Sequence, residues 1–142
     1  MPYNSWNPPP PWIKRAFAAA TGETDAYDRA ARQWSRVLAQ YPELRYAGGP
    51  VPQTLRQWYR SPDDLERMRR EGYSPAAEGQ HGAGLAVDVR PSDPEGVAAA
   101  ARAAGFAVRV YPSHLHVAAY PDSAWARLRP LLRAVGIFGG GE

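Results

Sequence analysis

The 142-residue sequence contains no cysteine, only three histidines and a single lysine, Lys14. The lack of cysteine excludes disulfide bonds, thiolate metal ligands and cysteine nucleophiles, so histidine and carboxylate side chains would have to hold any metal ion. No apolar run approaches the roughly 20 residues of a membrane-spanning helix, and we expect no membrane span. The first residues do not combine a basic stretch with a following apolar stretch, so we expect no secretory signal peptide.

A chain of this length fits one domain with a core of its own. Its 17 lysines and arginines against 14 acidic residues give a net charge of +3, which suits a polyanionic partner such as a bacterial cell wall or nucleic acid. The arginines are spread along the chain, and no recognised nucleic-acid-binding motif accompanies them. We therefore do not expect nucleic acid to be the partner.

The order of local patterns predicts an α+β fold: a small, mostly antiparallel sheet that carries a metal site, helices packed on that sheet, and an N-terminal helical extension. Apolar spacing and capping residues predict helices over 12–20 and 94–104, and a helix that begins at Thr24 or Asp25 and runs to about residue 40. Another helix is expected to start at Pro62, behind the cap Ser61, and to end at Gly72. The last helix is expected to follow the cap Asp122, and Pro130 would split or kink it. Strands are expected at 43–47, 85–89, 106–111 and 115–120. The predicted organisation is a proline- and aromatic-rich arm (1–12), one domain (13–138) and a glycine-rich tail (139–142).

All three histidines belong to one pattern of metal-ligand type. His81 opens the run H-G-A-G-L-A-V-D that ends at Asp88, and His114 and His116 form H-L-H. Residues two apart on a strand share a face, so the last two histidines would point the same way. Two imidazoles and one carboxylate, from His81, Asp88 and His116, would leave open the fourth position of a tetrahedral catalytic zinc site. The competing interpretation is three scattered histidines with no shared role.

The run H-x-x-G-x-A-x-D, with H-x-H-V downstream, resembles the M15 zinc peptidases. These are D-Ala-D-Ala carboxypeptidases and L-alanyl-D-glutamate endopeptidases, including small phage endolysins, and their fold is shared with lysostaphin-type peptidases and the hedgehog signalling domain. The resemblance covers about residues 44–120. It extends to Tyr59-Arg60-Ser61, Gly105-Phe106 and Tyr111.

The resemblance implies a role for each matching residue. His81, Asp88 and His116 would ligate Zn²⁺, which would activate water and polarise the amide carbonyl. Arg60 would bind a carboxylate or carbonyl of the substrate through its fork of donors. The alternative for Arg60 is a surface arginine beside a capped helix.

Two positions depart from the family pattern. The acidic general base expected three residues before the last ligand is Ser113, and the serine expected two residues before the first ligand is Gly79. In the lysostaphin branch the first histidine of H-x-H is not a ligand and assists proton transfer or stabilises the oxyanion, so His114 is the expected catalytic group. Its alternative is a histidine that supports the ligands or faces solvent, and Glu78 is a second candidate base.

These inferences predict a zinc peptidase that cleaves peptidoglycan stem peptides. It would be a phage endolysin in the host cytoplasm, released through a holin, or a lytic protein carried in the virion. The alternative is an inactive peptidase fold that serves as a structural or adaptor component of a phage particle. Ser113 at the position of the base motivates this alternative. So does the N-terminal arm with Trp6 and Trp12, which could pack on a neighbouring subunit of a homo-oligomer or virion assembly.

Overall fold

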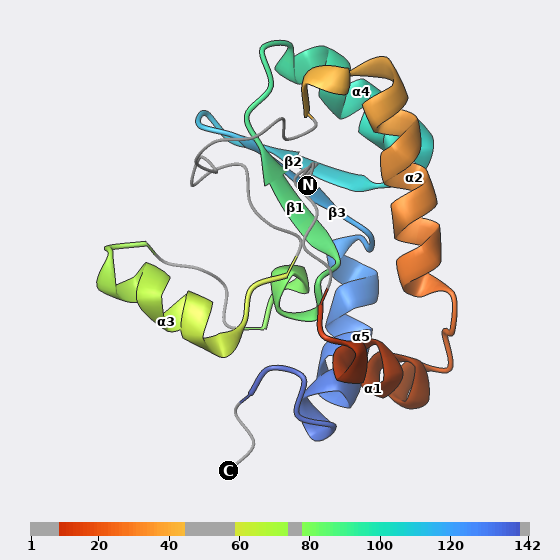
Figure 1. Cartoon of the computed structure of the whole chain (residues 1–142), viewed down its shortest axis with the longest axis vertical. Helices are drawn as coiled ribbons and strands as arrows, with labels where there is room; N and C mark the ends of the chain where they lie inside the picture. The colour runs from red at the N-terminus through yellow and green to blue at the C-terminus, as the bar shows by residue number, and fades with distance from the viewer. Residues whose placement is uncertain (1–8, 45–58, 74–77, 140–142) are drawn as a thin grey trace.

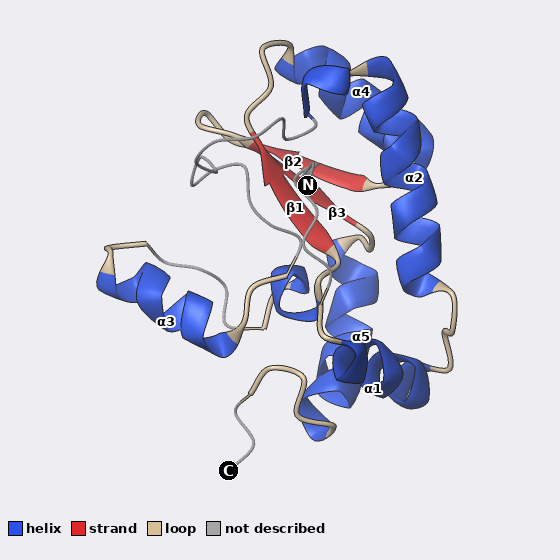
Figure 2. Cartoon of the chain, in the orientation of Figure 1, coloured by secondary structure: helices blue, strands red, loops and turns tan. Residues whose placement is uncertain are grey.

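The computed structural model describes residues 9–44, 59–73 and 78–139. Within these ranges the chain forms an α+β fold of five α-helices, two short 3-10 helices and three strands (Figures 1 and 2). The helices are α1 (Pro11–Thr21), α2 (Ala26–Gln40), η1 (Pro42–Leu44), α3 (Pro62–Arg70), η2 (Gln80–Ala83), α4 (Pro94–Ala104) and α5 (Asp122–Ala134). The strands are β1 (Ala86–Val89), β2 (Ala107–Val110) and β3 (Leu115–Ala118).

The three strands form one antiparallel sheet in the order β1-β3-β2, so β3 is central. In this register Asp88 of β1 lies opposite His116 of β3, which in turn lies opposite Arg109 of β2. A row of polar side chains therefore crosses one face of the sheet. The neighbouring positions alternate to the other face and are buried in the core: Val87, Val89, Leu115 and Val117.

Helices cover the apolar side of the sheet. Helix α4 packs against β2 and β3, and α2 packs against α4 (Figure 1). Trp34 of α2 meets Phe106, just before β2, in an edge-to-face contact with ring centroids 6.2 Å apart. Most of the buried apolar residues form one cluster, which includes residues as far apart in the chain as Ile13 and Ile137.

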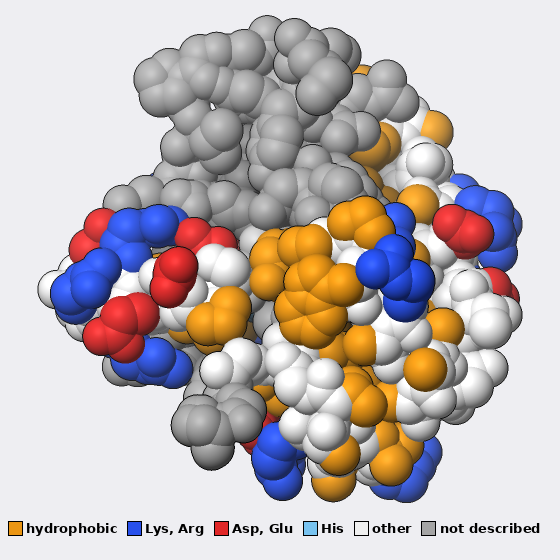
Figure 3. All heavy atoms as spheres, turned by 60° about the horizontal axis from the view of Figure 1, so that its bottom comes forward, with side chains coloured by type: hydrophobic (Ala, Val, Ile, Leu, Met, Phe, Trp, Pro, Cys, Tyr) orange, Lys and Arg blue, Asp and Glu red, His pale blue; other side chains and the backbone are white. Residues whose placement is uncertain are grey.

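Helix α3 lies to the side of the sheet and has a different surface from the other helices (Figure 1). Leu65 is its only buried residue, and most of its other side chains are acidic or basic (Figure 3). Ser61 and Asp64 form a reciprocal capping box at its start, which confirms the predicted N-cap at Ser61. Helices α1 and α5 pack together and expose large apolar side chains instead: Trp12 of α1, Leu131 of α5, and Val135 directly after α5.

The predicted helices at 12–20, 25–40, 62–72 and 94–104 and the strands at 85–89, 106–111 and 115–120 are confirmed, with ends that differ by one or two residues. The strand expected at 43–47 is wrong at its first two residues, since Pro42–Leu44 is a 3-10 helix in which Leu44 N–H donates to the carbonyl of Tyr41. The fixed φ of Pro42 suits such a turn. Residues 45–47 lie outside the described residues.

The expected cap of the last helix is also wrong. Pro121 occupies the N-cap position of α5, and Asp122 is the first helical residue. Its carboxylate accepts a hydrogen bond from the guanidinium of Arg109 on β2, which draws it away from the free N–H groups of the helix. Pro130 lies inside α5, which continues to Ala134, so the proline does not split the helix.

The two ends of the chain are described only in part. Of the predicted arm, Pro9 is buried, and its ring lies so close to Gly84 that a side chain there would overlap it. Residues 1–8 and 140–142 lie outside the described residues, so the predicted packing of the arm on a neighbouring subunit stays a prediction. No helix among the described residues is long and apolar enough to cross a membrane.

Candidate metal centre

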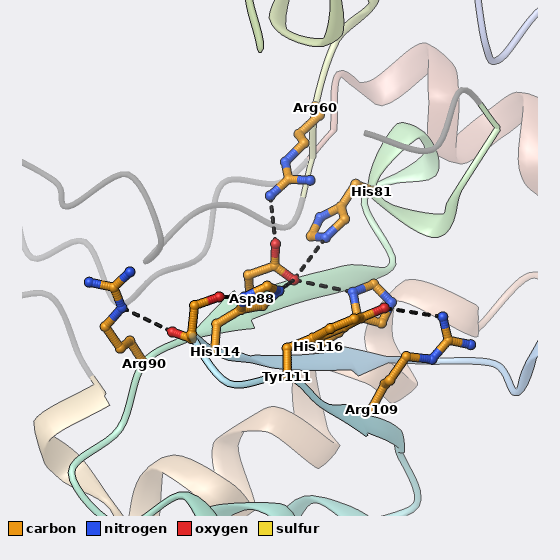
Figure 4. Close-up of polar contacts among 9 residues, drawn as sticks. Arg60, His81, Asp88, Arg90, Arg109, Tyr111, His114 and His116 are labelled. Atoms are coloured by element: carbon orange, nitrogen blue, oxygen red, sulfur yellow. Dashed lines mark hydrogen bonds and ion pairs between the residues drawn. The ribbon is translucent and has the colours of Figure 1, made fainter. Parts of the chain in front are cut away.

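The structure brings the three predicted ligands together. Asp88 and His116 are cross-strand neighbours, and His81 belongs to η2, which leads into β1. Asp88 Oδ1 lies 3.2 Å from His81 Nε2 and 3.1 Å from His116 Nδ1 (Figure 4). The two imidazole rings meet at a steep angle with centroids 5.3 Å apart. One carboxylate oxygen thus lies between two imidazole nitrogens.

Four hydrogen bonds fix the η2 turn that presents His81. The amide of buried Gln80 binds both backbone groups of Tyr120, donating to its carbonyl at 2.6 Å and accepting from its N–H at 2.9 Å. The Tyr27 hydroxyl donates to the carbonyl of Ala83 at 2.6 Å. The backbone N–H of Arg60 donates to the carbonyl of His81 itself. The turn is therefore tied to the end of β3, to α2 and to the segment before α3.

The spacing and chemistry of these side chains fit a metal ion. One ligand atom from each of His81, Asp88 and His116 can be chosen so that all lie within 4.8 Å of one another. Tetrahedral zinc, with ligands at about 2.0–2.1 Å, would hold neighbouring ligand atoms about 3.3 Å apart. The two contacts of Asp88 Oδ1 are already close to that spacing. A donor set of two imidazoles and one carboxylate suits zinc.

The second oxygen of Asp88 binds Arg60. Arg60 Nη2 donates to Asp88 Oδ2 at 2.7 Å. Burial favours the neutral carboxyl, but hydrogen bonds from His116 and His81 and the charge of Arg60 outweigh it, so the pKa of Asp88 is well below its ordinary value. Burial also favours the neutral form of His81, and for an imidazole this lowers the pKa; the hydrogen bond and the charge of Asp88 oppose this effect without reversing it. A charged carboxylate and a neutral imidazole are the forms in which these residues bind a metal.

His114 lies beside this cluster without joining it directly. Its Nε2 is 3.9 Å from Asp88 Oδ1, and its Nδ1 is 2.9 Å from the Ser113 hydroxyl. The ring stacks on Tyr111 with centroids 4.8 Å apart. His114 and His116 point to the same side of the sheet, as the two-residue spacing predicts (Figure 4).

Glu78, the other candidate base, faces α5. Arg133 donates two hydrogen bonds to its carboxylate, at 2.6 and 2.8 Å. These hydrogen bonds lower the pKa of Glu78. Its backbone carbonyl accepts a hydrogen bond from Trp125 Nε1. Glu78 thus holds the loop before η2 on α5, and among the described residues it has no recorded contact with the histidines.

Two further arginines share the polar face of the sheet and were missed by the sequence analysis. Arg90 follows Asp88 by two positions, and Arg109 lies opposite His116. Arg90 could have been found by extending the strand alternation one step beyond Asp88. Arg109 could be found only once the register between β2 and β3 was known.

No protein-family model matches the sequence, and neither a curated protein nor a solved structure shows significant similarity to the chain. The candidate function therefore depends on the residues and their geometry.

Proposed function

We propose that the protein is a zinc-dependent peptidase that hydrolyses an amide bond in peptidoglycan stem peptides, as a phage endolysin or a virion-associated lytic protein. The gathering of His81, Asp88 and His116 around one carboxylate oxygen is the observation that supports this proposal most directly. Bound there, zinc would supply Lewis-acid activation of water and of the amide carbonyl.

The residues around the ligands have distinct roles in this proposal. Arg60 holds Asp88 charged and oriented, and its remaining N–H groups are donors for a carbonyl or carboxylate of the substrate. His114 holds or delivers the proton at Nε2, the nitrogen that lies nearer to Asp88. The Ser113 hydroxyl and the Tyr111 ring orient His114, because they contact its Nδ1 and its face.

A second candidate is an inactive member of the same fold that has a structural or adaptor role in a phage particle. The specific observation in its favour is Ser113, which stands where the resembled peptidases have an acidic base. Among the described residues, Asp88 is the only carboxylate within ion-pair distance of the three histidines. In this alternative the metal would stabilise the fold rather than act in hydrolysis.

One experiment separates these functions. The metal-free protein is titrated with Zn²⁺ by calorimetry and then incubated with purified peptidoglycan with zinc or with EDTA, and released fragments are identified by mass spectrometry. Asp88→Asn should lose zinc binding and cleavage, whereas the exposed control Asp28→Asn should keep both. Zinc binding without cleavage of several wall chemotypes would favour the structural alternative. If the folded protein did not bind zinc, both the zinc peptidase and the alternative with a structural metal would be rejected.

A further inference from the structure

Three arginines surround the candidate metal centre on the polar face of the sheet. Figure 4 shows Arg60 on one side of Asp88, Arg90 beside His114, and Arg109 beyond His116. Two of them are paired with carboxylates: Arg60 with Asp88, and Arg109 with Asp122. These two positive charges are compensated within the fold.

Arg90 differs from the other two. No carboxylate of the described residues lies within ion-pair distance of its guanidinium, and the side chain is exposed. Its Nε donates to the backbone carbonyl of Ser113 at 3.0 Å. That single bond fixes the guanidinium beside the turn that carries His114. It leaves the two terminal nitrogens without a recorded partner among the described residues.

A guanidinium held in this way is arranged to bind an anion. The two terminal nitrogens of an arginine form a planar fork that matches both oxygens of a carboxylate. Because Nε is occupied by the Ser113 carbonyl, the end of the fork is the side that a ligand can reach. In Figure 4 these nitrogens lie on the same side of the sheet as Asp88 and Arg60.

We propose that Arg90 is a specificity-determining residue that binds a carboxylate of the peptide substrate, an inference that rests on the proposed function. Arg90 directly follows the last residue of β1, two positions beyond Asp88, and Cα atoms two positions apart in an extended chain are about 7 Å apart. That distance is about two residues of extended peptide. The carboxylate therefore belongs to the same short stretch of peptide as the bond placed at the metal, and it comes either from the peptide's C-terminus or from the free α-carboxyl group of a γ-linked glutamate.

The test uses the zinc-free protein and the stem peptide L-Ala-γ-D-Glu-L-Lys-D-Ala-D-Ala in three forms: the free acid, the C-terminal amide, and the form with D-isoglutamine in place of D-Glu. Binding is followed by NMR titration. Each amide form lacks one of the two candidate carboxylates. Wild-type protein should bind the free acid about tenfold more tightly than the amide form that lacks the carboxylate bound by Arg90, so the weaker amide shows which carboxylate that is. Arg90→Ala should bind the acid and that amide equally, and Arg90→Lys should keep part of the preference.

Two controls separate recognition from structure. The exposed Arg127 on α5 forms no ion pair with any of the described residues, so Arg127→Ala should keep the full preference. If Arg90 only held the Ser113 turn, Arg90→Ala would weaken binding of all three peptides equally, and the proposal would be overturned. It would also be overturned if wild type showed no preference, if the preference survived in Arg90→Ala, or if no peptide bound at its solubility limit. No step needs zinc or cleavage, so a failed peptidase assay is distinguishable from a failure here.

Discussion

Arg60 and Asp88 form an ion pair of 2.7 Å in which both side chains are only 12% exposed. The two residues come from segments far apart in the chain: Arg60 from the stretch before α3 and Asp88 from β1. The backbone N–H of Arg60 also donates to the carbonyl of His81. One residue thus contacts two of the three candidate ligands, through its side chain and its main chain.

Replacing Arg60 by alanine should destabilise the zinc-free protein by about 2 kcal/mol, because Asp88 would keep a largely buried charge without the partner that makes its shortest hydrogen bond. Zinc should reduce this cost, since the metal would restore positive charge beside the carboxylate. Urea unfolding of wild type, Arg60→Ala and Arg60→Lys, each with and without zinc, measures the effect. Unchanged stability of Arg60→Ala in both states would mean that the ion pair does not support the site and would favour a role in substrate binding alone.

His114 should be dispensable for metal binding but needed for hydrolysis. His114→Ala should retain zinc, because the other three side chains supply the ligand atoms. Its kcat on a stem peptide should fall by about 10²- to 10⁴-fold, the range of a lost general acid–base group, with little change in KM. Calorimetry and steady-state kinetics on the same preparation test both parts. Loss of zinc from His114→Ala would make it a ligand instead, and His116→Ala is the comparison that should lose the metal.

Much of the candidate site could be predicted because its ligands follow local rules. The two-residue spacing of His114 and His116 placed both on one face of a strand, and Asp88 within a short apolar run implied a second strand. Asp88 does lie in β1, and His114, which directly precedes β3, points to the same side of the sheet as His116 (Figure 4). The helix start at Ser61 could be predicted for the same reason, because a capping box involves residues only three apart in the sequence.

Pairings between distant segments could not be predicted in the same way. The approach of Arg60 to Asp88 depends on how residues 59–61, just before α3, lie against η2, and no periodicity encodes that arrangement. The carboxylate of Asp122 was expected to cap α5, but a side chain on strand β2, Arg109, competes for it. Local propensity predicts what a residue can do, whereas tertiary neighbours decide which partner it binds.

The capping box of α3 should make stability depend on pH in the acidic range. Burial favours the neutral form of Asp64, but hydrogen bonds from Ser61 and Arg67 outweigh it, so the pKa of Asp64 is lower in the folded protein than its ordinary value of 3.8. A carboxyl group with a lowered folded-state pKa stabilises the protein above its unfolded-state pKa and loses that contribution as the pH falls through the folded-state value. Asp64→Asn should therefore cost about 1 kcal/mol at pH 7.

This difference between wild type and Asp64→Asn should shrink as the pH is lowered below 3.8. Chemical unfolding of the two proteins at a series of pH values measures it, with Asp63→Asn as control, because the exposed Asp63 makes no side-chain hydrogen bond to any of the described residues. A difference that stays constant down to the acid limit would show that the carboxylate charge of Asp64 does not stabilise the helix start.

Gln80 should link the stability of the fold to the affinity for metal. Its buried amide binds the N–H and the carbonyl of Tyr120 at the end of β3, and it directly precedes His81. Gln80→Ala would leave both backbone groups without their partner, which should cost about 2–4 kcal/mol, since each buried unsatisfied group costs about 1–3 kcal/mol. The loosened turn should also weaken zinc binding by about tenfold, within the range for residues that support metal ligands.

Gln40→Ala, at the exposed end of α2, is the matched control and should change neither quantity. If Gln80→Ala lowered stability but left zinc affinity intact, the η2 turn would hold His81 without help from β3, through its bonds to Tyr27 and Arg60 alone.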